Sequence, residues 1–111
     1  MYEYDKLLEY RRQDSETKDI ESYIRALLET SHIGDKTRLV VLSCFKDREN
    51  TITLEVSGGS SQKGRWEEYL TALALFIRLI RLSFKDIWLV YLENDPANEL
   101  FYAYFGLRKR E

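Results

Sequence analysis

Apolar and polar positions follow two different periods along the chain, and three stretches of its second half show them most clearly. Residues 51–56 alternate apolar and polar side chains, which is typical of a strand with one buried face. Residues 66–82 form a long apolar run that predicts a helix, and residues 87–92 form a continuous apolar run typical of a strand buried on both faces. A strand, a helix and a strand in this order predict a right-handed crossover between two neighbouring parallel strands.

The loop between the first of these strands and the helix is rich in glycine. Residues 57–64 hold three of the chain's five glycines, so the backbone there is free to turn sharply and to approach a ligand closely. The N–H groups and the dipole at the start of the following helix favour an anion. The loop therefore predicts an anion site, with a flexible connection between strand and helix as the alternative.

The first half of the chain predicts a helix followed by a hairpin. Asp14 is a good N-cap, and apolar residues after it recur at three- and four-residue spacing until about residue 30. Residues 38–45 have the composition of a strand, and residues 46–50 form a polar turn. We therefore expect 38–45 to pair antiparallel with residues 51–56.

The two ends of the chain are less distinctive. Residues 6–13 fit either a short first strand or the start of a helix. Near the other end, Asp95 and Pro96 favour the start of a last helix over residues 97–105, with Gly106 as its C-cap.

Composition narrows the class of protein. The chain has 111 residues, of which 44% are apolar and 32% charged, and this fits one globular domain over residues 1–111. The net charge is −2 and no long basic block occurs, so nucleic acid is not an expected partner. The first residues lack the apolar core of a signal peptide, and no apolar run is long enough to span a bilayer. We expect a soluble cytoplasmic protein with no membrane partner.

Cysteine and histidine chemistry is limited by number. Cys44 is the only cysteine and His32 the only histidine, so the chain has no internal disulfide, which fits a reducing compartment. Neither the usual zinc site nor a Cys–His nucleophile is expected, and Cys44 is more typical of a core residue.

The end of the chain resembles the GNAT acetyltransferase superfamily, and the resemblance extends from about Leu7 to the end. In that family a buried strand ends in Asn, an Ala follows three residues later, and a helix carries a Tyr four residues before a Gly-Phe. Asn94 and Ala97 keep the first spacing, and Tyr102 and Gly106 keep the second. The resemblance implies an α/β fold: a mixed, mostly antiparallel sheet with a central parallel strand pair, flanked by helices, with C-terminal strands short or missing.

The family also binds the acetyl-CoA pyrophosphate on a loop with an Arg or Gln, two residues, a Gly, one residue, and then a Gly or Ala. The comparable residues here are 61–66, in which Gly64 fits, Ser61 replaces the Arg or Gln, and Trp66 replaces the small residue. The resemblance thus implies an acyl-CoA N-acyltransferase with a degenerate pyrophosphate loop, which transfers an acetyl group from acetyl-CoA to a small-molecule or protein amine.

The resemblance also implies roles for particular residues. Tyr102 would protonate the departing CoA thiolate, and Glu55 would take the proton from the amine. The implied acetyl-CoA contacts are Leu54, Val56, Ser61, Gln62, Lys63, Gly64 and Asn94. Each of the polar assignments has a structural alternative: an aromatic on a helix face for Tyr102, a solvent-facing carboxylate for Glu55, and a helix cap for Asn94.

A second, looser resemblance is to the ornithine decarboxylase antizymes, which have a GNAT-like fold but act by binding a partner protein. It rests on the strand and loop from Glu55 to Gly59, on Gly64 before the helix, and on the aromatic segment 102–107. A non-catalytic, antizyme-like binding protein is therefore the alternative function, and it tolerates the altered phosphate loop.

The helix expected at 66–82 is apolar on nearly all of its surface, whereas a helix on one face of a sheet needs only one apolar stripe. We therefore expect a homodimer, or a larger protein partner, bound through this helix or through an open sheet edge near residues 87–92.

Overall fold

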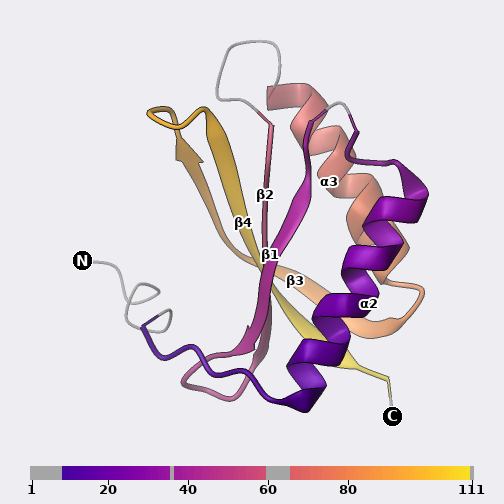
Figure 1. Cartoon of the computed structure of the whole chain (residues 1–111), viewed down its shortest axis with the longest axis vertical. Coiled ribbons are helices and arrows are strands. Elements are labelled where there is room, and N and C mark those ends of the chain that lie inside the picture. The colour runs from indigo at the N-terminus through magenta and orange to yellow at the C-terminus, as the bar shows by residue number, and fades with distance from the viewer. Residues whose placement is uncertain (1–8, 36, 60–65, 111) are drawn as a thin grey trace.

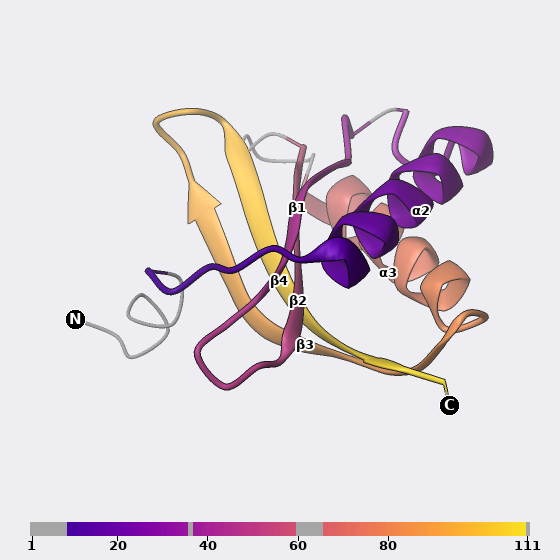
Figure 2. The same ribbon diagram turned by 60° about the horizontal axis from the view of Figure 1, so that its bottom comes forward.

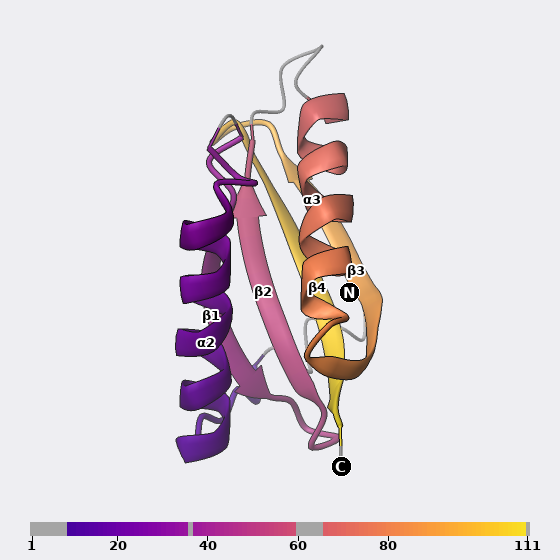
Figure 3. The ribbon, with the colours of Figure 1, turned by 90° about the vertical axis from the view of Figure 1, so that its right-hand side faces the viewer.

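A computed structural model describes residues 9–35, 37–59 and 66–110 of the chain, with the side chain of Trp66 excepted (Figure 1). Its elements are α2 (Ser15–Ser31), β1 (Val40–Lys46), β2 (Ile52–Gly58), α3 (Trp66–Ile80), β3 (Phe84–Asp95) and β4 (Leu100–Lys109). The strands form one sheet in the order β1-β2-β4-β3, and every neighbouring pair is antiparallel. Both helices lie on the same side of this sheet (Figures 2 and 3).

The helix predicted after Asp14 is confirmed. The Asp14 carboxylate accepts a hydrogen bond of 2.9 Å from the Thr17 backbone N–H, and the Thr17 hydroxyl accepts one of 2.9 Å from the Asp14 backbone N–H. This reciprocal capping satisfies two donors that the first turn of α2 would otherwise leave free. Ile20, Ile24 and Leu28 then follow at four-residue spacing and are buried against the sheet.

The predicted hairpin of β1 and β2 is also confirmed. Its turn is held by the Asp47 carboxylate, which accepts hydrogen bonds from the backbone N–H groups of Glu49 and Thr51. Asn50 adopts a positive φ of 63°, a conformation that asparagine tolerates better than most residues. Local turn chemistry therefore agrees with the alternation of the strands.

The helix predicted over residues 97–105 is wrong, because this part of the chain is strand β4. Asp95 and Pro96 begin a tight turn instead, in which the Asp95 carboxylate accepts hydrogen bonds from the backbone and side-chain N–H groups of Asn98. An Asp-Pro pair suits the first positions of a β-turn as well as the start of a helix. Phe101, Ala103, Phe105 and Leu107 are all buried in the main core, which is the period of a strand.

The expected GNAT-like α/β fold, with its central parallel strand pair, is wrong for the same reason. β4 lies between β2 and β3 and pairs antiparallel with both, so residues 51–56 and 87–92 are not neighbours. The described part of the chain is a small α+β fold, with one antiparallel sheet and two helices. A crossover would have placed β3 beside β2 as a parallel neighbour. Instead, the chain turns back after β3, and β4 occupies the position next to β2.

The main core lies between the helices and the sheet. α2 packs on β1, and α3 lies over the half of the sheet that contains β4 and β3 (Figure 3). The predicted helix at 66–82 is confirmed as α3. Residues 87–92 form part of a strand as predicted, but β3 is an edge strand and is not buried on both faces: 53% of Leu89 is exposed.

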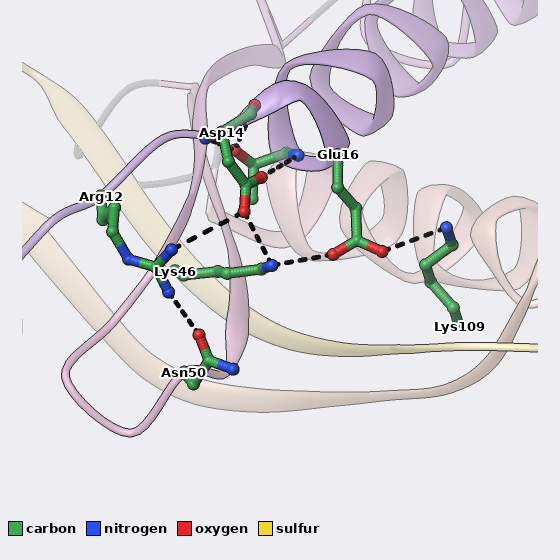
Figure 4. Close-up of polar contacts among 7 residues, drawn as sticks. Arg12, Asp14, Glu16, Lys46, Asn50 and Lys109 are labelled. Carbon is green, nitrogen blue, oxygen red and sulfur yellow. Dashed lines mark hydrogen bonds and ion pairs between the residues drawn. The ribbon is translucent and has the colours of Figure 1, made fainter.

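A network of charges fixes the start of α2 against the sheet (Figure 4). Lys46, at the end of β1, lies 2.8 Å from the Asp14 carboxylate and 2.9 Å from the Glu16 carboxylate. Glu16 in turn accepts a hydrogen bond of 3.2 Å from Lys109, at the end of β4. The network therefore connects the N-terminus of α2 with the ends of both an outer and an inner strand.

The same network makes the stability of the fold depend on pH. The hydrogen bond from Lys46, followed by that from the Thr17 backbone, lowers the pKa of Asp14 from 3.8 to about 2. The folded state thus favours the ionised Asp14 carboxylate. Asp14 therefore stabilises the fold at pH values above its ordinary pKa of 3.8, and this stabilisation is lost as the pH falls from about 4 to about 2.

We predict that Lys46→Met lowers the melting temperature at neutral pH and makes its decline between about pH 4 and pH 2 shallower, because Asp14 then titrates closer to its ordinary pKa. Circular dichroism melts across this pH range measure both effects. Lys18→Met, on an exposed position of α2, is the control and should follow the wild type. Parallel curves for wild type and Lys46→Met would show that Lys46 does not set this pH dependence.

Candidate functional site

The structure places the described residues of the acetyl-CoA hypothesis in different surroundings. Leu54 and Val56 are fully buried in the core under the helices. Asn94 is exposed on β3, opposite Phe101 of β4. Ser61, Gln62, Lys63 and Gly64 lie outside the described residues. Asn94 also does not cap a helix, because no helix follows it in the described part of the chain.

Glu55 and Tyr102 do lie on one side of the sheet, the side opposite the helices. In the register of β2 and β4, Ser57 is opposite Tyr102 and Glu55 is opposite Tyr104. Residues two apart in a strand share a face, so these four side chains form one polar and aromatic surface. The direct neighbour of Glu55 is therefore Tyr104, and not Tyr102.

Glu55 is buried and has a partner on each carboxylate oxygen. Only 7% of the residue is exposed. Arg11 donates to Oε1 at 2.9 Å, and the Tyr104 hydroxyl donates to Oε2 at 2.7 Å. We refer to Arg11, Glu55 and Tyr104 as the Glu55 clasp. A buried carboxylate is tolerated only when its charge is paired and its oxygens are bonded, and the clasp meets both conditions.

The clasp is extended by aromatic contacts. The Arg11 guanidinium lies 4.7 Å from the centre of the Phe45 ring, on β1, which is a cation–π distance. The Tyr104 ring is 6.0 Å from the ring of Tyr91, on β3. These contacts connect the clasp to β1 through Phe45 and to β3 through Tyr91.

Burial, followed by the hydrogen bond to Glu55, raises the pKa of the Tyr104 hydroxyl. The hydroxyl therefore keeps its proton at neutral pH and remains a donor to the carboxylate. Each Glu55 oxygen already accepts a hydrogen bond from within the protein, one from Arg11 and one from Tyr104. This geometry holds the segment before α2 against the sheet.

Arg11 connects the clasp to the chain before α2. The adjacent residue Arg12 exchanges two backbone hydrogen bonds with Lys46 of β1, and its side chain donates to the Asn50 side chain in the hairpin turn. Figure 2 shows this segment crossing the β1 edge from the side opposite the helices. The clasp therefore anchors the entry to α2 on the far face of the sheet.

Trp88 and Leu89 lie on opposite faces of β3, at the outer edge of the sheet. The Trp88 indole lies across Gly106 of β4 so closely that a Cβ at position 106 would overlap it, and the Arg108 guanidinium is 5.9 Å from the indole. Leu89 is opposite Phe105, on the side of the helices. With 37% of Trp88 and 53% of Leu89 exposed, both faces of this edge present apolar surface.

The other candidate chemistry has no support in the described residues. Cys44 is buried, and burial raises its pKa to about 12, so it stays a protonated core thiol rather than a nucleophile. Within residues 9–35, 37–59 and 66–110, no three His, Cys, Asp or Glu side chains gather where they could hold a metal ion. None of the helices in these ranges has the length and apolar character to cross a membrane.

Two members of the clasp could not be identified from the sequence. Tyr104 was part of an aromatic segment assigned to a helix, and Arg11 lay in a segment without a clear assignment. Arg11 is 44 residues from Glu55 and Tyr104 is 49 residues from it, so no local spacing connects them. The available signal was the density of aromatic residues from Phe101 to Phe105, which also fits a strand.

Comparisons with protein-family models, with curated proteins and with solved structures found no match to this chain.

We predict that Tyr104→Phe lowers the free energy of unfolding by about 1–3 kcal/mol, because a buried carboxylate oxygen then loses its donor. Tyr102→Phe is the matched control on the same strand and should change the free energy by less than about 0.5 kcal/mol. Urea unfolding followed by tryptophan fluorescence measures both. Equal losses in the two variants would show that the Tyr104 hydroxyl has no special role at Glu55.

Proposed function

We propose that this chain is a non-catalytic binding protein that takes an extended segment of another protein along β3. The observation that carries the proposal is the edge position of β3, a strand of 12 residues with apolar side chains exposed at its centre. The acyltransferase hypothesis required neighbouring parallel strands with a slot between them, and β4 occupies that place. Binding is the one of the two expected functions that does not depend on this slot.

An edge strand offers backbone donors and acceptors to another chain. Among the described residues β3 pairs only with β4, so the N–H and C=O groups along its outer side are available. An extended peptide that adds to such an edge gains main-chain hydrogen bonds, and its alternate side chains contact the two faces of the sheet. Trp88 would meet one set of these side chains and Leu89 the other.

Trp88 has the properties of an interface anchor. Its ring is supported by Gly106 beneath it and by Arg108 beside it, so little rotamer freedom remains to be lost on binding. Tryptophan and arginine are enriched among the residues that dominate binding energy. The absence of a side chain at Gly106 makes room for the indole, part of whose surface remains exposed.

Two bulges in β3 and the acidic residues near its end restrict which peptide segment can bind along this strand. Register shifts occur in β3 between Phe84 and Asp86 and between Leu89 and Tyr91, and such bulges limit indiscriminate edge pairing. Toward the β3–β4 turn, Glu93 and Asp95 have no ion pair within the part of the chain that the structure describes. A matching segment would be short, apolar at its centre and basic at the end that reaches Glu93.

Selection from a display library of random linear peptides tests this proposal with a defined probe. We predict that the enriched peptides have an apolar centre and a Lys or Arg end, and that they slow backbone amide exchange along β3. Leu89→Lys should weaken their binding at least about tenfold, because it places a charge at the centre of the edge. Leu75→Lys, at an exposed leucine of α3, is the control and should bind as the wild type does.

Three results would contradict the proposal: no enrichment, protection that falls on α3 rather than on β3, or equal effects of the two lysine variants. Stoichiometric binding of acetyl-CoA in calorimetry would also contradict it, because that result supports the acyltransferase hypothesis.

A further inference from the structure

One flank of α3 is largely exposed. It consists of Glu67, Leu70, Ala74, Ile77, Arg78 and Arg81, which we call the α3 flank. At 3.6 residues per turn, about 100° per residue, these positions form a stripe beside the buried Tyr69, Leu73, Phe76 and Ile80. Arg81 follows the last residue of α3, and its N–H donates to the Ile77 carbonyl at 3.0 Å, so the stripe continues to it. All six residues are exposed except Ile77, which is half-buried.

The α3 flank faces away from α2 except at Glu67. The opposite flank of α3 carries Glu68, Thr71 and Leu75, which line a hollow with His32 and Ile33 at the end of α2, and Glu67 lies at the border of the same hollow. α3 is the outer helix on the half of the sheet that contains β4 and β3, and no third helix of the described residues lies beyond it (Figure 3). Nothing in these residues therefore covers the α3 flank.

The flank is apolar at its centre and oppositely charged at its ends. Leu70, Ala74 and Ile77 form the centre. Glu67 lies near the N-terminus of α3 and Arg81 just past its C-terminus, and neither makes an ion pair within residues 9–35, 37–59 and 66–110. Glu67 and Arg81 are equally far from Ala74 in the sequence, as are Leu70 and Arg78.

We propose that the α3 flank binds the same flank of a second copy of this chain, with the two α3 helices antiparallel and the two-fold axis at Ala74. A two-fold interface pairs residue i with residue j and residue j with residue i. Around Ala74 this symmetry places Glu67 beside the partner's Arg81 at both ends, and the aliphatic part of Arg78 over the partner's Leu70. The small side chain of Ala74 lets the helix axes approach to about 8 Å at the crossing point.

The charges favour this arrangement over its main alternative. If the two α3 helices were parallel, Glu67 would lie beside Glu67 and Arg81 beside Arg81 of the second copy. Like charges across an interface oppose binding and suppress wrong orientations. The antiparallel pair converts all four of these charges into ion pairs, and the apolar centre supplies the area removed from water. The partner is therefore a second copy, because the flank is complementary to itself.

Charge reversal with rescue tests the proposal. In sedimentation velocity over a concentration series, the wild type should be a dimer. Glu67→Arg and Arg81→Glu should each weaken dimerisation at least about tenfold, because each variant places like charges together at both ends. The double variant Glu67→Arg, Arg81→Glu should restore dimerisation to within about threefold of the wild type, because the pairs are re-formed with opposite signs.

Glu68→Arg is the matched control. Glu68 is exposed, belongs to the same first turn as Glu67, and lies on the other flank, so this variant loses the same favourable interaction with the helix dipole without touching the interface. It should dimerise as the wild type does, and circular dichroism melts should show that every variant is folded. A wild type that is monomeric at high concentration overturns the proposal, and so does a folded double variant that remains monomeric.

The same assay separates this dimer from the proposed binding of a peptide along β3. Leu89→Lys changes the sheet edge and should leave the dimer intact. Loss of the dimer in Leu89→Lys, with no effect of the Glu67 and Arg81 variants, would assign self-association to β3 and would overturn the α3 interface.

Discussion

The pairing of β4 with two strands at once is the constraint on which the rest of the fold depends. β4 is hydrogen-bonded to β2 on one side and to β3 on the other, and both pairings are antiparallel. Its side chains therefore serve two layers: Phe101, Ala103, Phe105 and Leu107 complete the core under the helices, whereas Tyr102 and Tyr104 lie on the opposite side. Without β4 in this position, β2 and β3 would have no common neighbour and Glu55 would have no tyrosine opposite it.

The second side of the sheet is organised around a buried charge. An antiparallel sheet usually leaves such a side to solvent, but here Glu55 is buried, and its charge is balanced by Arg11 and shared with the Tyr104 hydroxyl. Removing one partner from a buried charge is costly, so the clasp specifies where the segment before α2 must lie. Lys46, at the end of β1, likewise fixes the start of α2, because it forms ion pairs with Asp14 and Glu16. Two separate charge contacts thus fix the same segment from the two sides of the β1 edge.

Two helices do not cover all the apolar surface of a four-stranded sheet, and exposed apolar side chains remain on β3 and on α3. α2 and α3 cover the sheet unequally, and the outer part of β3 and one flank of α3 have no covering element among the described residues. Exposed apolar surface rimmed by charges is typical of protein interfaces. The two surfaces differ in kind, because the β3 edge offers backbone hydrogen bonds together with a supported tryptophan, while the α3 flank offers a self-complementary charge pattern. They therefore suit different partners, an extended segment for the edge and a second copy for the helix.

The sequence by itself determined the elements whose signals are local. The Asp14 cap and the four-residue spacing of Ile20, Ile24 and Leu28 define α2, and the Asp47–Asn50 turn with its alternating flanks defines the hairpin. α3 follows from its long, mostly apolar run, whose excess of apolar residues was also visible in the sequence.

Only the tertiary structure determined the conformation of residues 97–105. Asp95-Pro96 suits a turn as well as a helix start, and the aromatic residues after it can bury one face in either conformation. Pairing with β2, which is distant in the sequence, and with β3 across a short turn selected the strand. The Glu55 clasp was decided in the same way, because its partners are brought together only by strand register and by the path of the segment before α2. Local propensity cannot report contacts whose energy depends on residues more than 40 positions away.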